Sequence, residues 1–411
     1  MSNCDPINEC IACGGTDLVE VLNLNSQPLA NSYKTKMNGT EELFPLAINR
    51  CKSCNHVQLT HKVNPGLLFK NYLYVSGTTK TQLEYFDWFS RFAVETFSGT
   101  PRTVLDIGCN DGSQLDYFKK LNFETHGVDP AENLYELSSQ RHKIVCDYFN
   151  DKTYSYGTLF DIIVCQNAFA HNYNQLELLK NISNVMGAYS LLFISTSQAD
   201  MILNGEFDTI YHEHLSFYCI NSMNELCKRA GLNLINVIKH PIHGKSFIFV
   251  ISKFKSASNH IENLINCERE SGLYDDITYV EYAKKCNNVV LKYREYMMQM
   301  KHKNIPIIGY GAPAKGNTFL NYAKVYPDYI IDDNPMKQGK FTPGSSVAIY
   351  GPELLDKINS DSLCFVPLAW NFYKEIKERI KARRNGKDYF LCYFPEVFLE
   401  DSNNTVLYHP V

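Results

Sequence analysis

Apolar runs alternate with amphipathic stretches through the middle of the chain, and this alternation predicts its largest domain. Between about residues 103 and 253, apolar segments rich in β-forming residues are separated by stretches of helical period. The segments are 103–108, 124–129, 143–148, 160–167, 190–196 and 247–253. Strands that alternate with helices pair in parallel, so we expect a doubly wound α/β domain here.

A second, shorter alternation lies near the C-terminus. Its segments are 304–323 (strand, glycine turn, helix), 329–335 (strand, turn) and 362–380 (strand, helix). The charged segment 255–300 has a helical period and predicts a connecting helix or a helical hairpin. The first 65 or so residues carry short strand-like pieces instead. We therefore expect a small N-terminal module (1–65), a central Rossmann-like domain with trailing helices (66–295) and a smaller C-terminal α/β Rossmann-like domain (296–411).

Composition narrows the class of protein. The 411 residues are 45% hydrophobic and 20% charged, with a net charge of −4, which is typical of a folded soluble protein and gives no basic surface for nucleic acid. We find no apolar run of about 18 residues, and the first residues lack a leader pattern, so we expect a cytoplasmic protein that does not bind membranes. No heptads or large apolar stripes demand assembly, which favours a monomer.

Four of the fourteen cysteines form a pattern of their own. Most of the others lie singly in apolar segments, as expected of small buried side chains. Cys10 and Cys13 form one CxxC pair, and Cys51 and Cys54 form a second. Two such pairs supply four thiolates to one tetrahedral metal and leave no open coordination position, which predicts a structural zinc site. A redox role is weaker, because neither pair sits on a strand-to-helix turn, and unrelated buried cysteines are the remaining alternative.

The first predicted strand of the central domain ends in a glycine turn, VLDIGCNDG at 104–112. Gly108 and Gly112 allow a ligand to approach the backbone, and Asn110 adds an amide. The spacing is not the dinucleotide fingerprint GxGxxG. Asp129 ends the next strand, where a carboxylate can accept hydrogen bonds from ribose hydroxyls.

Polar residues also end the strands that follow. Ligands of such sheets bind outside the carboxyl ends of the strands, so we expect these side chains to line one crevice. They are Asp106, Asp129, Asp147 and Asn167. The series resembles the pattern of S-adenosylmethionine (SAM) methyltransferases. The alternative is an ordinary α/β domain with incidental acids at its strand ends.

The second glycine turn, 309–316, is less specific. It is not a P-loop, and its glycines stretch the dinucleotide fingerprint by one residue. Gly311 and Lys315 predict a cradle for a phosphate or a sugar nucleotide, with the lysine as counter-charge. A purely structural turn is the alternative.

Residues 207–218, FDTIYHEHLSFY, concentrate titratable and aromatic side chains. The stretch is not the HExxH of metalloproteases, because Ser216 replaces the second histidine. Metal ligation by His212 and His214 stays open, although the aromatic neighbours favour an organic substrate. A histidine is the usual general base at neutral pH, and an adjacent carboxylate such as Glu213 can orient it. Tyr211 can then stabilise developing negative charge.

The cysteine quartet, VLDIGCNDG, YHEHLSFY and GYGAPAKG occur in this order, and over essentially the whole chain the sequence resembles the sugar-nucleotide C-methyltransferases. These enzymes act on 4-keto-deoxy sugars, as do the dTDP-4-keto sugar 3-C-methyltransferases. The resemblance implies SAM as cofactor and a nucleotide-linked keto sugar, most simply dTDP-linked, as substrate. It also implies that His214 is the base with Tyr211 and Glu213 as partners. Further residues that the resemblance places at the substrate are His171, Tyr72 and Tyr74.

The implied reaction is removal of a proton beside the keto group, stabilisation of the enolate and methylation of the carbon, with no metal at the reacting centre. One departure is Lys245, which stands where the family commonly has a glycine and bears on sugar or diphosphate contacts. Two alternatives stay open, an O- or N-methyltransferase on another metabolite and a non-catalytic nucleotide-binding protein. A dehydrogenase using the second glycine turn is less favoured.

Overall fold

The computed structural model describes residues 3–37, 40–69, 75–240, 246–255 and 259–407. The chain divides into two compact units. The first contains Met1–Glu20, Asn49–Asp200 and Glu213–Asp275, and the second contains Val21–Ile48, Met201–His212 and Asp276–Val411. The chain thus crosses between the units several times, once inside the YHEH motif. The domain boundaries at 65 and 295 remain predictions drawn from the sequence.

The first unit is built on a seven-stranded sheet with the strand order β12-β13-β10-β9-β6-β7-β8. Its strands are β6 (Thr103–Ile107), β7 (Glu124–Val128), β8 (Lys143–Val145), β9 (Phe160–Gln166), β10 (Met186–Thr196), β12 (Asn233–His240) and β13 (Ser246–Ser252). The strands from β8 to β10 are parallel, while β13 pairs antiparallel with both β10 and β12. The predicted doubly wound domain is confirmed.

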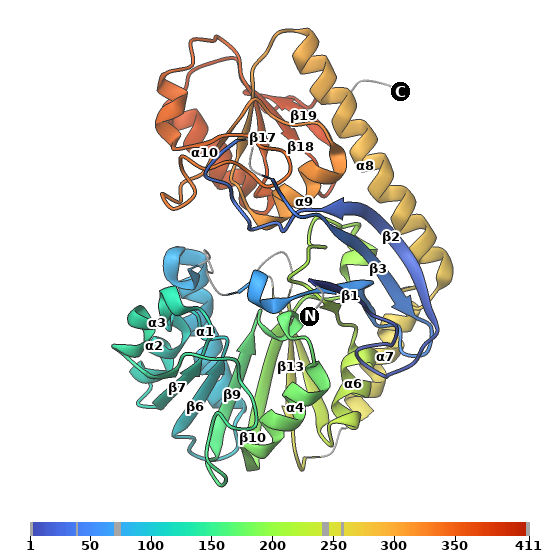
Figure 1. Ribbon diagram of the computed structural model, residues 1–411, viewed down its shortest axis with the longest axis vertical. Coiled ribbons are helices and arrows are strands. Elements are labelled where there is room, and N and C mark those ends of the chain that lie inside the picture. The colour runs from blue at the N-terminus through green and yellow to red at the C-terminus, as the bar shows by residue number, and fades with distance from the viewer. Residues whose placement is uncertain (1–2, 38–39, 70–74, 241–245, 256–258, 408–411) are drawn as a thin grey trace. The chain divides into compact units, whose positions relative to one another are not determined.

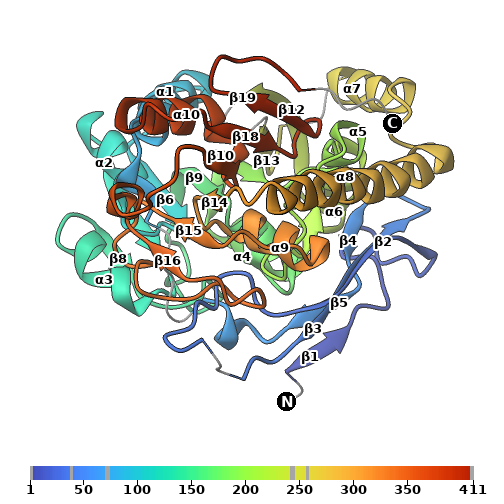
Figure 2. The ribbon, with the colours of Figure 1, turned by 90° about the horizontal axis from the view of Figure 1, so that it is seen from above.

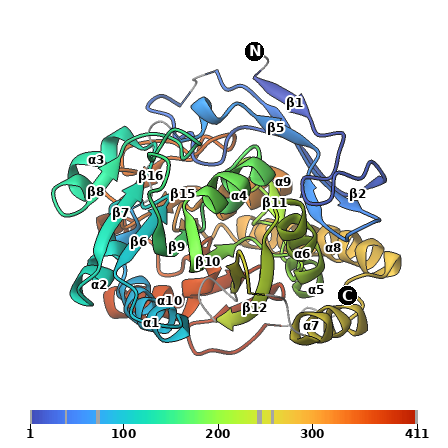
Figure 3. The ribbon, with the colours of Figure 1, turned by 90° about the horizontal axis from the view of Figure 1, so that it is seen from below.

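Helices cover both faces of this sheet, as Figure 3 shows. One face buries apolar residues of α1 (Lys80–Thr96) and α2 (Ser113–Lys120). The other buries those of α4 (Gln175–Asn184), α6 (Ile220–Arg229) and α7 (Asn259–Glu270). The helix α3 (Glu132–Ser139) lies between β7 and β8 in the chain. Each sheet face is thereby removed from water, which explains the continuous apolar runs of the central strands.

Strands make up the N-terminal region, as the sequence predicted, but two of them are longer than expected, with ten residues in β2 and eight in β3. They are β1 (Cys4–Pro6), β2 (Leu18–Gln27), β3 (Phe44–Cys51), β4 (Val57–Leu59) and β5 (His61–Val63). The strand β1 pairs with β5, and a four-stranded sheet has the order β11-β4-β3-β2. Its member β11 (Ser216–Phe217) comes from the segment that follows YHEH, so this sheet joins distant parts of the sequence.

The second unit contains a six-stranded sheet with the order β16-β15-β14-β17-β18-β19. Its strands are β14 (Ile307–Tyr310), β15 (Tyr329–Ile331), β16 (Ile349–Tyr350), β17 (Cys364–Pro367), β18 (Tyr389–Cys392) and β19 (Phe398–Asp401). Pairing is parallel except between β18 and β19. Figure 2 shows α9 (Ala314–Ala323) and α10 (Tyr373–Arg383) on opposite sides of this sheet. The second Rossmann-like fold is confirmed.

The charged segment after the central sheet is helical, as predicted. It forms α7 and then the long helix α8 (Asp276–His302), which is labelled in Figure 1. The short helix α5 (Met201–Asn204) precedes the YHEH motif. Across the parts of the chain described here, no helix is both long enough and apolar enough to cross a membrane.

Candidate functional site

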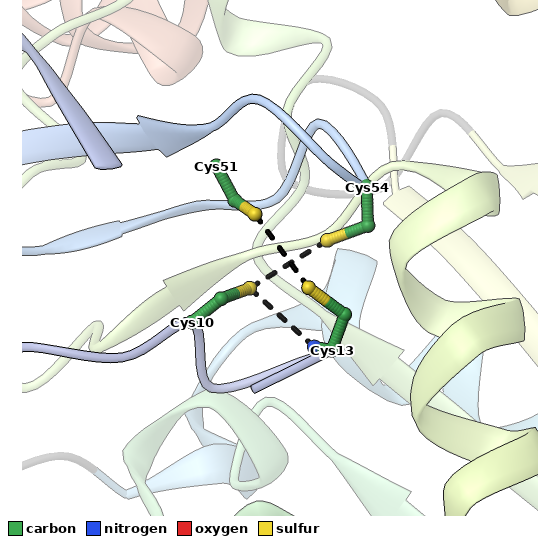
Figure 4. A group of neighbouring side chains, drawn as sticks. All are labelled: Cys10, Cys13, Cys51 and Cys54. Atoms are coloured by element: carbon green, nitrogen blue, oxygen red, sulfur yellow. Dashed lines mark hydrogen bonds between the residues drawn. The ribbon is translucent and has the colours of Figure 1, made fainter. Parts of the chain in front are cut away.

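The four predicted metal ligands converge on one point, as Figure 4 shows. Their sulfur atoms all lie within 4.8 Å of one another. The sulfurs of Cys10 and Cys54 are 3.5 Å apart, and those of Cys13 and Cys51 are 3.6 Å apart. Tetrahedral zinc with bonds of about 2.3 Å would place its sulfurs about 3.8 Å apart, so the quartet fits zinc with little adjustment.

Hydrogen bonds favour the thiolate form of one of these cysteines, which is the form that binds metal. A proton shared by Cys10 and Cys54 lowers the pKa of Cys10 to about 4 and raises that of Cys54, so the pair favours one thiolate, the form that binds metal. The amide N–H groups of Cys13 and Gly15 point at the sulfurs of Cys10 and Cys13. Both pairs also sit on tight turns, closed by the bonds from Cys10 N–H to the Gly15 carbonyl and from Cys51 N–H to the His56 carbonyl, each 2.8 Å long.

We expect the purified protein to contain about one zinc ion per chain and the Cys51→Ser variant to contain almost none. Loss of a closed four-sulfur centre removes metal-binding free energy from the folded state, so the unfolding temperature should fall by about 10 °C or more. Elemental analysis and thermal unfolding measure both effects. A Cys227→Ser variant is the control, because Cys227 is equally buried but lies in α6. Full zinc retention in Cys51→Ser would contradict the assignment.

The first glycine turn follows β6 and is held to the next strand of the sheet. Gly108 has a φ of 80° and donates its N–H to the Val128 carbonyl at 2.8 Å. A Cβ at this position would lie 2.4 Å from the Cβ of Ala168, so only glycine fits. The two oxygens of Asp129 accept the N–H groups of Asn110 and Ala131, both at 2.8 Å. Each oxygen retains lone-pair capacity for the ribose hydroxyls that the sequence predicts.

Three acids gather at this turn. Asp106 is only 3% exposed, and burial, together with the nearby charges of Asp129 and Asp111, raises its pKa to about 8. Such a negative cluster suits a ligand with cationic groups, and SAM carries a sulfonium and an ammonium. The residues present therefore fit SAM. Asp111 was not predicted; its Oδ2 accepts the N–H of Gly77 at 3.1 Å, and the Asn110 side chain accepts that of Ser76 at 3.0 Å.

The remaining predicted cofactor residues lie at the same edge of the sheet. Asp147 is exposed just after β8, and Asn167 is exposed just after β9 with a φ of 54°. Because β8, β7, β6 and β9 are adjacent and parallel, their carboxyl ends form one edge, as the sequence implied. Gly112, with a φ of 80°, caps the N-terminus of α2 at this edge.

We expect the affinity for SAM to rise with pH up to about 8 and then to level off. Asp106 is protonated below its pKa of about 8, and a cationic ligand favours the ionised carboxylate. Binding should therefore strengthen by up to about tenfold per pH unit as this group ionises. Calorimetric titration of the wild-type protein and of Asp106→Asn separates this effect from the ionisation of SAM itself. An equal pH dependence in both proteins would contradict the expectation.

Two histidines, one of them just after β9, stack on each other. The rings of His171 and His214 have centroids 5.3 Å apart and an angle of 24° between their planes. The ring of Phe69 also stacks on His171, with centroids 5.5 Å apart. His171 follows β9 in a short 3₁₀ turn, Phe169–His171. Burial lowers the pKa of His171 to about 4, so its ring is neutral at physiological pH. The structure thus brings together two of the predicted catalytic side chains.

The other members of YHEH have different surroundings. Glu213 and His212 are each 2% exposed. The Nε2 atom of His212 lies 3.3 Å from the Phe44 carbonyl, and burial lowers the pKa of His212 to about 4. Among the described residues the only group of three or more candidate metal ligands is the cysteine quartet. Tyr211 is half-buried. The predicted substrate residues Tyr72, Tyr74 and Lys245 lie outside the described residues.

Sequence reasoning missed an anchor just before this motif. Asp208 is 2% exposed, and its Oδ2 accepts hydrogen bonds from Trp370 Nε1 at 2.6 Å and Tyr393 OH at 3.1 Å. These partners are more than 160 residues away in the sequence, so no local pattern announces them. Asp208 thereby fixes the segment that leads to Tyr211.

In the second glycine turn, the backbone N–H and carbonyl of Ala312 both have hydrogen-bond partners elsewhere in the protein. Ala312 donates its N–H to Asp332 at 2.7 Å, and its carbonyl accepts from Lys337 at 2.9 Å and from the Tyr33 hydroxyl. Asp332 is 8% exposed and lies 3.6 Å from the Lys337 ammonium. Lys315 has its ammonium 5.1 Å from the Trp370 ring centre. These contacts favour the structural reading of the turn, and substrate binding by Gly311 and Lys315 remains a prediction.

Family models match three consecutive stretches, described as "Putative zinc binding domain" (residues 10–69), "Methyltransferase domain" (78–237) and "C-methyltransferase C-terminal domain" (241–395). The C-methyltransferase NovU of Streptomyces niveus is 28% identical over 98% of this chain and 99% of its own length.

Two solved structures are similar over part of the chain. The plantazolicin methyltransferase BpumL, in complex with a desmethylPZN analog and S-adenosylhomocysteine, is 18% identical, covers 43% of this chain and 86% of its own, and has a TM-score of 0.36. The 1,6-didemethyltoxoflavin-N1-methyltransferase of Burkholderia thailandensis is 15% identical, covers 42% and 78%, and has a TM-score of 0.34.

The Rossmann-like sheet with its acidic turn and the matching methyltransferase model define a SAM-dependent methyltransferase. The cysteine quartet, inside the matched zinc-binding region, is its structural zinc site. Over its full length the chain is similar to a C-methyltransferase, and its C-terminal part matches the model of a C-methyltransferase C-terminal domain.

Proposed function

We propose that this enzyme methylates the carbon next to the keto group of a nucleotide-linked 4-keto-deoxy sugar, at carbon 3, with dTDP as the preferred nucleotide. The order of motifs along the chain and the full-length similarity to the C-methyltransferase NovU support this assignment. The observation that carries it is the stacked pair of His171 and His214 at the edge of the crevice, because only a carbon nucleophile requires removal of a C–H proton.

In the proposed reaction His214 removes the proton. A histidine is neutral over much of the physiological range and can accept it, and the buried carboxyl of Glu213, the preceding residue, would stabilise the charge that the ring acquires. Tyr211, as a hydroxyl donor, would stabilise the enolate oxygen. Tyr74 and Tyr72 are further residues that we propose contact the substrate.

His171 would act as a second donor to the enolate. Because its ring is buried and neutral, it can donate an N–H hydrogen bond without adding a second cation beside His214. The stack also fixes the orientation of both rings, which lowers the cost of aligning base and substrate.

The cofactor would lie at the turn of residues 108–112, with Asp129 at the ribose and Asp106 near its cationic groups. When bound, SAM supplies the electrophilic methyl group. The chain's own contribution is to hold the carbon, the base and the cofactor in one place from which water is excluded. Lys315 and Gly311, in the second unit, are the proposed contacts for the nucleotide diphosphate.

We expect His214→Ala to lower kcat by about 10²- to 10⁴-fold on a dTDP-4-keto-deoxy sugar and to abolish exchange of the substrate C–H with deuterated water. Proton removal precedes methylation, so exchange should occur in the wild-type enzyme even without SAM. Proton NMR follows both reactions. His302→Ala, an exposed change at the end of α8, is the control. Unchanged exchange in His214→Ala would refute the role of the base.

We expect His171→Asn to lower kcat by about 10²-fold while leaving the acid limb of the pH–rate profile in place. Burial holds the pKa of His171 near 4, so its ring stays neutral above that pH and does not produce a limb between pH 5 and 8. Steady-state rates across this range provide the measurement. Disappearance of the limb in His171→Asn would show instead that this residue titrates during catalysis.

A further inference from the structure

His56 belongs to the second cysteine turn, but it is not one of the four zinc ligands. Its backbone carbonyl accepts the N–H of Cys51 at 2.8 Å and so closes the turn. Its side chain is fully buried. The ring points away from the cysteine turn and contacts Ser216 and Tyr218, in the segment that follows His214.

The ring nitrogens of His56 have two serine partners. Nε2 lies 3.1 Å from the Ser216 hydroxyl and Nδ1 lies 3.4 Å from the Ser222 hydroxyl, while the ring packs at 4.5 Å on Tyr218. Ser222 donates its own proton to the Cys219 carbonyl, so it accepts from Nδ1–H. This leaves Nε2 to accept from Ser216.

The backbone makes the same connection. Strand β4 pairs antiparallel with β11, with Ser216 opposite Gln58 and Phe217 opposite Val57. One residue further, Leu59 donates its N–H to the Leu215 carbonyl at 3.0 Å, and Leu215 donates its own N–H to the Ala170 carbonyl at 3.0 Å. Leu215 directly follows His214, and Ala170 directly precedes His171. Both stacked histidines are therefore fixed through one residue.

Gln58 links this strand to the first cysteine turn. It is fully buried, and its side-chain oxygen accepts the N–H of Ile11 at 2.8 Å while its amide donates to the Glu9 carbonyl at 3.1 Å. Ile11 stands between Cys10 and Cys13. Both cysteine turns thus determine where β4 lies.

We propose that His56 and Gln58 are positioning residues that transmit the geometry of the zinc centre to His214. The inference rests on the proposed function, in which His214 is the base. The N-terminal module with its cysteine quartet then sets the position of His214 in addition to stabilising the fold. A displacement of about 1 Å at a catalytic group can cost as much as 100-fold in rate, so loss of this brace should lower kcat between about 10- and 100-fold. The KM for the sugar and the affinity for SAM should change little.

The test uses His56→Phe, which keeps a planar ring but removes both nitrogens, and Ser216→Ala, a smaller change at the other end of the same hydrogen bond. Proton–nitrogen NMR spectra of the histidine-labelled full-length protein report the environments of His214 and His171, with His214→Gln and His171→Asn providing the assignments. We expect both variants to displace the His214 signals while zinc content and SAM affinity persist. His56→Gln, which restores a donor and an acceptor, should return the signals toward wild type.

Coupling between the two ends gives a second readout. If His56 acts through Ser216, the double variant should lose no more kcat than His56→Phe alone, whereas independent effects would multiply. Glu268→Gln is the matched control, because Glu268 is buried and its carboxylate accepts hydrogen bonds from Ile220, Asn221 and Tyr274, none of which belongs to β4 or β11. It should leave the His214 signals in place.

The outcomes are separable from those of the proposed function. Unchanged His214 signals in His56→Phe and Ser216→Ala, with zinc retained, overturn the proposal whatever the activity. An equal displacement in Glu268→Gln also overturns it, since general loosening would then be the cause. If the signals move as expected but the wild-type enzyme does not methylate a keto sugar, the brace stands and the proposed substrate fails.

Discussion

Two backbone hydrogen bonds of Leu215 hold the candidate catalytic histidines, His171 and His214, in position. The N–H of Leu215 donates to the carbonyl of Ala170, which precedes His171, and its carbonyl accepts the N–H of Leu59 in β4. The segment that carries His171 and the strand β4 are therefore both bonded to this one residue. A single buried hydrogen bond contributes only about 1 kcal/mol to stability. Its value here is positional, because two stacked histidines depend on it. The cysteine quartet, the short strand β4 and the segment that follows His214 are therefore connected by hydrogen bonds despite their distance in the sequence.

The two Rossmann-like sheets share one hydrogen bond at the glycine turn, but the charges around it differ. In each, an aspartate after the second strand accepts an N–H from the glycine turn, Asp129 from Asn110 and Asp332 from Ala312. In the second sheet a lysine also lies beside the aspartate and neutralises it. The first turn instead brings Asp106 and Asp111 near Asp129, and burial together with these charges raises the pKa of Asp106 to about 8. This difference explains why a cationic cofactor suits the first turn, while substrate binding at the second turn remains a proposal.

Much of the fold could be predicted because its signals are local. Continuous apolar strands, glycine turns and paired cysteines each follow from a few neighbouring residues, and the seven-stranded sheet, the second sheet and the cysteine quartet are confirmed. The strand β12 was missed because it lies at the sheet edge, where six of its eight residues are not fully buried. Asp208, Asp111 and His56 were missed because their meaning depends on partners distant in the sequence. The chemical roles of His171 and His214 could be suggested by residue type, whereas their stacking required the structure.

Formation of a carbon–carbon bond is the central claim, and isotope coupling tests it most directly. The enzyme would be incubated with SAM labelled with ¹³C in the methyl group and a dTDP-4-keto-deoxy sugar labelled with ¹³C in the ring, and the product examined by carbon NMR. We expect a one-bond ¹³C–¹³C coupling between the new methyl group and the ring carbon next to the keto group. A methyl signal without that coupling, from a methyl group carried on oxygen or nitrogen, would contradict it.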